Sequence, residues 1–253
     1  MAETAAEAAG RAAPGTAAEE TAEVWWARRQ DAAPRLDSFL DRAERERLAA
    51  YRRDEDRQRF LVGCALAKTV IAGRTGQRPA EVSFDRTCGQ CAKPHGKPAV
   101  RGGPEFSVSH SGDLVAVAVA AAPVGVDVEQ AEGRARPPGG DDPAALARMV
   151  LAEQERAVLD AIDPRDRARA FLVAWTRKEA VTKAKGDGLR VPFTEVIVAA
   201  DAAAPRLVAW PYPQDPRSVS LLDLDTEPGY VAALAVLGRC RAVRPADGSA
   251  LLA

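Results

Sequence analysis

The chain has 253 residues, 47% of them hydrophobic and 28% charged, a composition typical of a globular protein with a substantial core. Its formal net charge of −1 argues against bulk nucleic-acid binding, because proteins that neutralise phosphate backbones carry a basic excess. No apolar run approaches the roughly 20 residues that span a bilayer, no secretory signal opens the chain, and four cysteines are too few for a disulfide scaffold. We therefore expect a cytoplasmic protein without membrane association.

The first half of the chain is expected to combine one long helix with several strands. Residues 1–20 are rich in Ala and Glu and predict a disordered tail, and residues 24–30 predict a first strand. Apolar residues recur at helical spacing from Asp54 to Ala72. Short strands are expected at 81–84, 97–100, 105–109 and 114–122. The last two should pair as a hairpin.

The second half repeats this plan after residue 122. A strand at 123–130 precedes a Pro/Gly/Asp loop at 133–143 and two helical segments. Further strands are expected at 195–200, 206–210, 218–225 and 230–238. We therefore predict an α+β protein whose N-terminal subdomain (21–122) and C-terminal subdomain (123–241) are similar, followed by a loose tail at 242–253. Sites often lie in the cleft at such a junction.

The strand at 123–130 carries two carboxylates on one face. Val124, Val126 and Val128 share one face, and Asp127 and Glu129 lie on the other. Alternate positions of a strand are roughly 7 Å apart, so the two charges repel unless water screens them or a cation lies between them. An antiparallel strand with one solvated face is the simpler interpretation, and a cation site is the alternative.

A second carboxylate-bearing pattern occurs on the helix predicted at 166–186. Phe171, Trp175 and Glu179 are spaced i, i+4 and i+8, and Lys183 continues the same row. A surface Glu–Lys pair would stabilise the helix by about 0.3–0.5 kcal/mol and would explain the spacing. It does not explain why Glu179 shares a face with a tryptophan, where a carboxylate needs a partner such as Lys183 or a metal.

Hydroxyl groups and an imidazole cluster in the predicted hairpin. Ser107 and Ser109 alternate with Phe106 and Val108, and His110 lies in the turn. A polar hairpin tip is one interpretation. An anion pocket is the other, because serine hydroxyls, turn amides and imidazole can all donate hydrogen bonds to a phosphate.

The stretch TCGQCAKPHGKPAV (87–100) contains half of a zinc site. Cys88, Cys91 and His95 have ligand-like spacing, but no second C-x-x-C is present to complete a four-ligand set. His95 and Lys97 could instead contact a bound ligand. The role of this group stays open at the level of sequence.

Three segments taken together, FSVSHSG (106–112), GVDVE (125–129) and WTRKEAVTKAKGDGL (175–189), resemble the 4′-phosphopantetheinyl transferases of the Sfp-like, surfactin-synthetase-activating type. The similarity covers about residues 45–240 and includes GKP (96–98). It implies a pseudo-twofold arrangement of two similar α/β subdomains, with the active site and coenzyme A at their interface. It also implies Mg²⁺-dependent transfer of phosphopantetheine from coenzyme A to a serine of an apo acyl or peptidyl carrier protein, with release of 3′,5′-ADP, by a monomer.

The resemblance also assigns residues. Asp127, Glu129 and Glu179 match the acidic residues that hold Mg²⁺, and three hard oxygen ligands suit that ion. The catalytic residues it implies are Asp127, Glu179 and Lys183, with Glu179 as the candidate base for the carrier serine and Lys183 beside the leaving phosphate. Those implied for coenzyme A are Arg59, Lys97, Ser109, His110 and Lys183.

One residue departs from the family pattern, and two rival functions stay open. Phe60 stands where some members of the family have a hydroxyl residue, and Arg47 is a further basic candidate. A serine hydrolase using Ser109 or Ser111 with His110 is disfavoured, because no G-x-S-x-G motif is present. A carrier-binding module without catalysis is the other alternative, and loss of coenzyme A binding would favour it.

Overall fold

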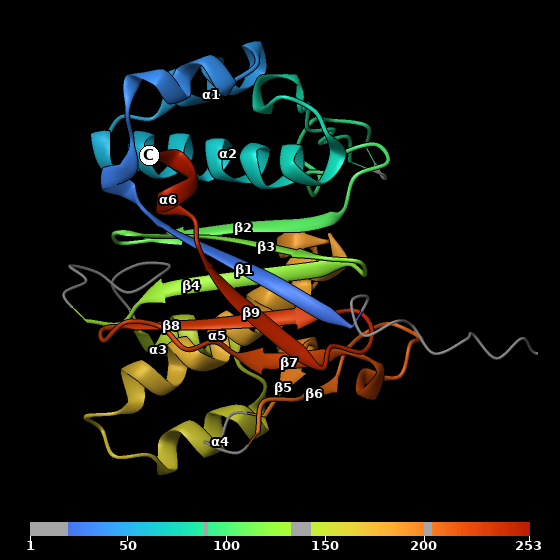
Figure 1. The fold of residues 1–253 in the computed structure, drawn as a ribbon. Coiled ribbons are helices and arrows are strands. Elements are labelled where there is room, and N and C mark those ends of the chain that lie inside the picture. Colours follow the sequence, from blue (N-terminus) through green and yellow to red (C-terminus); the bar gives the residue numbers. More distant parts are fainter. Residues whose placement is uncertain (1–19, 89–90, 133–142, 200–203) are drawn as a thin grey trace, which may run out of the picture.

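Two helix-covered sheets pack face to face in the computed structural model, which describes residues 20–88, 91–132, 143–199 and 204–253 (Figure 1). The predicted disordered tail, apart from Glu20, and the predicted loop, apart from Pro143, lie outside the described residues. The first sheet has the order β2 (Glu105–Ser111), β3 (Leu114–Ala120), β1 (Thr21–Arg28), β9 (Ala242–Asp247). The second has the order β4 (Val124–Gln130), β8 (Tyr230–Val236), β7 (Ser220–Asp223), and β5 (Ile197–Val198) pairs with β6 (Leu207–Ala209).

Helices cover the outer face of each sheet. On the first sheet lies α2 (Asp54–Thr75), with α1 (Arg42–Ala50) packed on the side of α2 away from the strands and the short α6 (Ser249–Leu252) beside it. On the second sheet lies α5 (Arg167–Lys185), with α3 (Pro143–Val150) and α4 (Glu153–Ala161) farther from the strands. The α+β class and the two similar halves predicted from the sequence are confirmed. No helix in the described ranges combines the length and apolar character needed to cross a bilayer.

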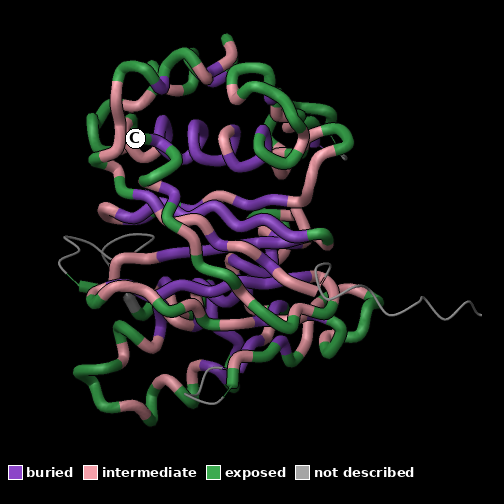
Figure 2. Tube along the Cα trace, viewed as in Figure 1, coloured by how far each residue is buried: buried purple, intermediate pink, exposed green. Residues whose placement is uncertain are grey.

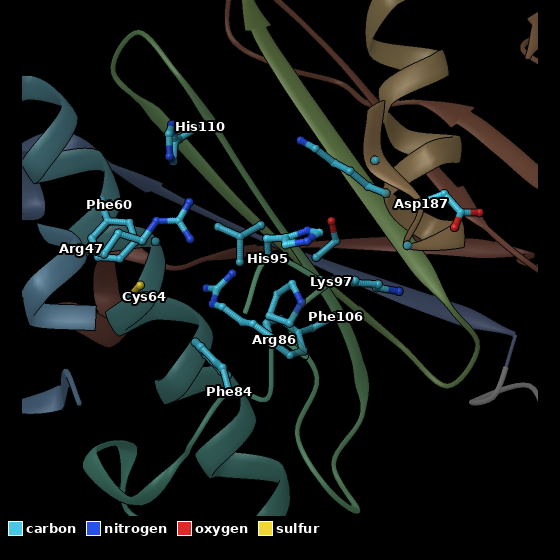
Figure 3. A pocket seen from close by; sticks show the side chains of 18 of the residues that line it. Arg47, Phe60, Cys64, Phe84, Arg86, His95, Lys97, Phe106, His110 and Asp187 are labelled. Atoms are coloured by element: carbon cyan, nitrogen blue, oxygen red, sulfur yellow. The ribbon is translucent and has the colours of Figure 1, made fainter. Parts of the chain in front are cut away.

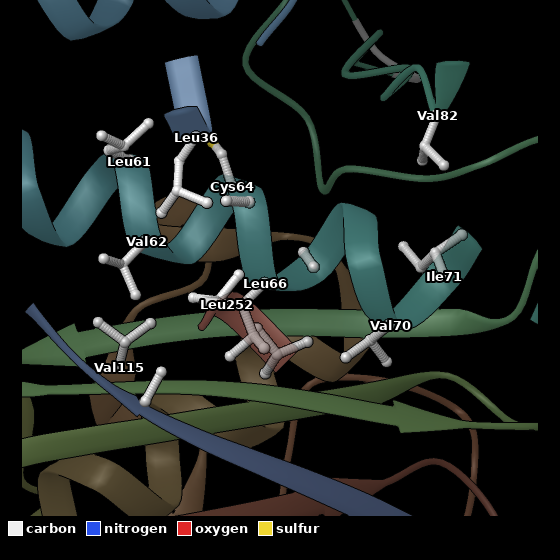
Figure 4. Packing of buried hydrophobic residues seen from close by; sticks show 14 of the residues in the cluster. Leu36, Leu61, Val62, Cys64, Leu66, Val70, Ile71, Val82, Val115 and Leu252 are labelled. Atoms are coloured by element: carbon white, nitrogen blue, oxygen red, sulfur yellow. The ribbon is translucent and has the colours of Figure 1, made fainter. Parts of the chain in front are cut away.

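The long helix α2 packs on the first sheet because its apolar side chains point at β1 and β3. Val62, Leu66 and Val70 are buried against the sheet beside Val115 (Figure 4). The predicted helix is therefore confirmed, and it extends to Thr75 before the left-handed cap at Gly76.

The inner faces of the two sheets form a shared core. Val124, Val126 and Val128 of β4 pack there with small side chains such as Ala116 of β3 and Ala232 of β8. Figure 2 shows that these central strands are almost entirely buried. Because Ala has a short side chain, the sheets approach closely and fix how the two halves of the chain are aligned.

The prediction of a loose C-terminal tail at 242–253 was wrong. Residues 242–247 form β9, which pairs in parallel with β1, and Leu252 of α6 is buried against α2 (Figure 4). The physical reason is that β1 would otherwise present an unpaired edge, and backbone hydrogen bonding to it requires no apolar pattern. The chain end thus returns to the first sheet.

Other boundaries also differ from the expectations. The strands predicted at 81–84 and 97–100 reduce to a single bridge between Asp85 and Ala99, because neither segment reaches a sheet edge. The first strand begins at Thr21 and ends at Arg28, and a turn after Val150 divides the first predicted helical segment into α3 and α4.

Candidate functional site

Alternate serines of β2 join the first sheet to the open edge of β4. Their hydroxyl oxygens accept hydrogen bonds from every second backbone N–H of β4, over N···O distances of 3.1, 3.2 and 3.1 Å. The pairs are Ser107 with Val126, Ser109 with Val128, and Ser111 with Gln130. These side chains satisfy edge amides that would otherwise be buried without partners, so β4 is held in one register against β2.

The same serines orient the two carboxylates of β4. The Ser109 hydroxyl donates to Asp127 Oδ1 over 2.8 Å, and the Ser111 hydroxyl donates to Glu129 Oε2 over 2.7 Å. The simpler expectation, a strand with a solvated outer face, is therefore wrong at Asp127, of which only 4% is exposed. The second face of β4 lies under α5.

Gly125 explains how α5 comes so close to β4. A Cβ atom at this position would lie 2.0 Å from the carbonyl oxygen of Ala180 and 2.4 Å from the backbone nitrogen of Ala184. Only glycine allows this approach, in which the α5 backbone rests directly on the strand. The contact brings Glu179 and Lys183 of α5 over the carboxylate-bearing face of β4.

Lys183 provides the cation that the buried Asp127 needs. Its Nζ lies 2.6 Å from Asp127 Oδ1 and 3.1 Å from Ser109 Oγ, and it also donates to the carbonyl of Val126 over 3.3 Å. Burial raises the pKa of Asp127, while the charge of Lys183 opposes that rise. Among the described residues, Asp127 Oδ2 has no hydrogen-bond partner. An unpaired buried carboxylate oxygen is costly unless a proton or a cation occupies it.

Glu179 lies half-buried beside this pair. Burial raises the pKa of Glu179 to about 7, the charge of Lys183 opposes the rise, and the charges of Asp127 and Glu129 add to it. Its protonation therefore changes near neutral pH, as expected for a group that exchanges protons in a reaction. The three acids thus occupy one electrostatically coupled cluster.

The donor set fits Mg²⁺ in its chemistry. Three carboxylates supply hard oxygen donors, and one buried oxygen of Asp127 lacks a partner in the described part of the chain. The oxygens of the three acids do not all lie within 4.8 Å of one another. Within the described ranges, a different group of side chains meets that spacing. The ammonium of Lys183 is paired with Asp127, one of the three acids.

A cavity of about 570 Å³ lies next to this cluster, between the two halves (Figure 3). Residues of α1, α2 and β2 form one side of it, and the segment after α5 forms the other. Its basic lining side chains are Arg47, Arg86, Lys97, Lys183 and Arg190. Among its described lining residues, the acidic side chain is Asp187. A concave surface with this charge balance attracts anions.

Lys183 belongs to both features, because it lines the cavity and pairs with Asp127. The three acids do not line the cavity themselves in the described structure. His110 lines the cavity and is open to solvent. The protein around its ring, together with the charges of Lys183 and Arg59, lowers its pKa, so its imidazole is neutral at pH 7. Ser109 and His110 point to opposite faces of β2, so they are not paired as a nucleophile and a base.

Of the remaining residues expected to bind coenzyme A, one lines the cavity and one does not. Lys97 lines the cavity, and its Nζ contacts Glu105 and the carbonyl of Ala184. Arg59 instead donates to the carbonyl of Gly112 and to Asp56, where it supports the hairpin turn outside the cavity lining. Phe60 lines the cavity, with the guanidinium of Arg47 over its ring.

Two cavity arginines were missed from the sequence. Arg86 precedes the cysteine pair, and Arg190 follows α5, and neither lies in a periodic segment that could indicate its direction. Their proximity depends on how two loops from different halves meet. The only available signal was position, since each is close in sequence to a segment already suspected of binding a ligand.

Comparison with known proteins identifies the family of the chain. Residues 24–122 match the family model described as 4′-phosphopantetheinyl transferase, N-terminal, and residues 123–235 match that of the 4′-phosphopantetheinyl transferase superfamily. The chain is 30% identical to the 4′-phosphopantetheinyl transferase HetI of Nostoc sp. over 73% of each chain. It is 26% identical to the 4′-phosphopantetheinyl transferase Sfp of Bacillus subtilis, over 81% of this chain and 85% of that protein. The solved holo-[acyl-carrier-protein] synthase of Thermotoga maritima covers 47% of this chain and 64% of its own at 24% identity, with a TM-score of 0.35, too low to carry an argument.

The resemblance found in the sequence is therefore confirmed. The two family models meet between residues 122 and 123, at the start of the segment that leads into β4. The carboxylates of β4 and the acid and lysine of α5 fall within the second model. This chain belongs to the 4′-phosphopantetheinyl transferase family.

Proposed function

We propose that the chain transfers 4′-phosphopantetheine from coenzyme A to a serine hydroxyl of an apo acyl or peptidyl carrier protein and releases 3′,5′-ADP. The observation that carries this proposal is Lys183, whose ammonium lies at once in the acidic cluster and in the wall of a basic cavity. A phosphoryl-transfer site needs both features, a surface that binds phosphates and a charge that stabilises the leaving group.

The cavity is suited to the nucleotide end of coenzyme A. Arg47, Arg86, Lys97 and Arg190 provide cations around a space of about 570 Å³, within the usual range for small-molecule sites. Phosphate groups bind to such cations through charge-assisted hydrogen bonds. The neutral imidazole of His110 adds a hydrogen-bonding group without adding charge.

The acidic cluster is suited to hold Mg²⁺ through Asp127, Glu129 and Glu179. When bound, the ion would supply positive charge to the diphosphate. Ser109 and Ser111 hold the two β4 carboxylates in fixed orientations, which lowers the cost of assembling the site. Both Asp127 and Glu179 must be deprotonated to act as ligands, so acidic pH should weaken metal binding.

Two groups on α5 provide the remaining steps. Lys183 would offset the negative charge that develops on the leaving phosphate of 3′,5′-ADP. Glu179, whose pKa is raised to about 7, is a suitable acceptor for the proton that the carrier serine loses as its oxygen attacks phosphorus. Because Glu179 is also a proposed ligand, this transfer can run through water.

The experiment is a mass measurement of the carrier. The purified chain with coenzyme A, Mg²⁺ and an apo carrier should add one phosphopantetheine group, and a carrier whose acceptor serine is replaced by alanine should gain none. Asp127→Ala should reduce the rate by at least about 100-fold, while Asp160→Ala, an exposed acid on α4, should not change it. Failure of the unaltered chain on several carriers, with coenzyme A still bound, would contradict the proposed reaction.

A further inference from the structure

The loop between the bridge residue Asp85 and β2 contains a second group of metal-ligating side chains. The donor atoms of Cys88, Cys91 and His95 all lie within 4.8 Å of one another, and the described residues contain no other set of three His, Cys, Asp or Glu side chains that close. Cys91 Sγ and His95 Nε2 are 2.9 Å apart. This group lies outside the acidic cluster, and the proposed reaction does not use it.

The backbone of this loop folds back on itself in a way that gathers the donors. The N–H of Cys88 donates to the carbonyl of Lys93 over 2.9 Å, and the N–H of Ala92 donates to the carbonyl of Cys88 over 2.9 Å. Ala92 has a φ of 56°, a left-handed conformation that is unfavourable for a residue with a Cβ atom. Such strain persists where the surroundings over-determine the conformation, as ligation of the adjacent Cys91 would.

Charge and accessibility also suit a metal. Arg190 Nη1 lies 3.1 Å from Cys88 Sγ, and a guanidinium there favours the thiolate that a metal requires. Cys88 is 2% exposed, whereas Cys91 and His95 are exposed. One side of the group is therefore packed against protein, and the other is open for entry of an ion from solvent.

We propose that Cys88, Cys91 and His95 bind one Zn²⁺, with two thiolates and an imidazole as protein ligands and water in the fourth position. Two sulfurs and one nitrogen are the donors that tetrahedral Zn²⁺ prefers, and they differ from the oxygen donors that suit Mg²⁺. Binding deprotonates both thiols, and the two protons leave to solvent.

The site would act by positioning the cavity wall. His95, Gly96 and Lys97 line the cavity immediately after the cysteines. A Cβ at Gly96 would lie 2.8 Å from the carbonyl oxygen of Thr87, so this part of the loop has no room to shift inward. Since Arg190 comes from the other half of the chain, the metal would also hold the loop against the segment that follows α5.

The test uses the untagged full chain, freed of metal, mixed with one equivalent of Zn²⁺ under reducing conditions and then desalted. We expect about one zinc per chain, and protection of Cys91 from alkylation. Replacement of Zn²⁺ by Co²⁺ should give the intense absorption of thiolate-to-metal charge transfer, which carboxylate ligands do not produce. Cys91→Ser and His95→Ala should each weaken affinity by at least about 10-fold to 100-fold.

Both altered side chains are exposed, so these variants should fold, and circular dichroism would check this. Cys240→Ser is the matched control, because Cys240 lies outside the loop and should leave the zinc content unchanged. The proposal is overturned if the unaltered chain retains no more zinc than His95→Ala. It is also overturned if the retained zinc is lost in Glu129→Gln but kept in Cys91→Ser, or if Cys88 and Cys91 form a disulfide under these reducing conditions. None of these results depends on transferase activity, so the zinc proposal can be overturned while the proposed function still stands.

Discussion

The ammonium of Lys183 lies 2.6 Å from Asp127 Oδ1, and this ion pair links α5 to β4 across the interior of the second half. Asp127 has 6% of its side chain exposed and Lys183 has 29%, so water reaches one partner and hardly the other. The pair therefore serves two purposes. It makes the burial of Asp127 tolerable, and it holds Lys183 at the wall of the cavity.

Removing the cation should be more damaging than removing both charges. Lys183→Met leaves Asp127 buried without its cation and should lower the free energy of unfolding by about 3 kcal/mol at pH 8 in metal-free buffer. The loss should shrink at acidic pH, because protonation of Asp127 removes the uncompensated charge. Urea unfolding at several pH values measures both effects.

The double variant Lys183→Met with Asp127→Asn provides the control for that interpretation. It should recover part of the lost stability, because no buried charge then remains unpaired. If the double variant loses as much free energy of unfolding as the two single variants together, the two side chains do not interact as an ion pair.

The hydrogen bonds that Ser107, Ser109 and Ser111 of β2 make with β4, here called the serine ladder, should contribute to stability as well as to the site. Ser109→Ala leaves the N–H of Val128 without its partner and removes a donor from Asp127, which should cost about 1–3 kcal/mol. Ser38→Ala is the matched control, because Ser38 is exposed and donates only to the carbonyl of Arg35 nearby in its own segment. Its replacement should change the free energy of unfolding by less than about 0.5 kcal/mol. Equal losses in the two variants would show that the ladder does not carry this stability.

The sequence predicted the elements that carry the acids because their periodicity is local. The alternation of valine and carboxylate defined β4, and helical spacing defined α5. The row from Phe171 to Lys183 forms the margin of the buried face, because Trp175, Glu179 and Lys183 are only half-buried, whereas positions on other rows, such as Lys178 and Val181, are fully buried. How Asp127 and Lys183 meet was not predictable from those patterns. It follows from Gly125, whose missing side chain lets the helix rest on the strand, and a glycine between two valines gives no indication of what will pack on it.

The errors have a common physical cause. The strand predicted at 81–84 has suitable residues but lacks a neighbour to pair with. By contrast, β9 contains a proline and no apolar alternation, yet it pairs with β1 from Thr21 to Trp26. Strand formation at an edge depends on available backbone partners more than on side chains. The cavity arginines Arg86 and Arg190 were missed for a similar reason, because their direction is set by tertiary contacts.

Glu179 should make the metal-free protein less stable as pH rises. Its pKa is raised from 4.5 in the unfolded chain to about 7 in the fold, so the folded state binds the proton more tightly. The contribution of protonated Glu179 to the free energy of unfolding is fully present below about pH 4.5 and is lost as pH rises through about 7. The change is roughly 3 kcal/mol at most, since each unit of pKa difference corresponds to about 1.4 kcal/mol.

Glu179→Gln should therefore flatten this part of the stability profile, measured by urea unfolding with EDTA between pH 4.5 and pH 8. Some dependence should persist, because the pKa of Asp127 is raised as well. Glu195→Gln is the control, because Glu195 is exposed and its replacement should leave the profile unchanged. An unaltered profile in Glu179→Gln would show that Glu179 is not the group that titrates.

Gly125 should be the most sensitive small residue of the site. Gly125→Ala places a Cβ 2.0 Å from the carbonyl oxygen of Ala180, which is backbone and cannot rotate away, so α5 must move off β4. We expect a loss of at least about 3 kcal/mol, as for strong overpacking, together with loss of transferase activity. Gly73→Ala is the matched control, because Gly73 lies in α2 with no atom within 4 Å of the added Cβ, and alanine there should stabilise the helix by about 0.5–1 kcal/mol. If Gly125→Ala keeps both its stability and its activity, the close contact between strand and helix is not what places Lys183 beside Asp127.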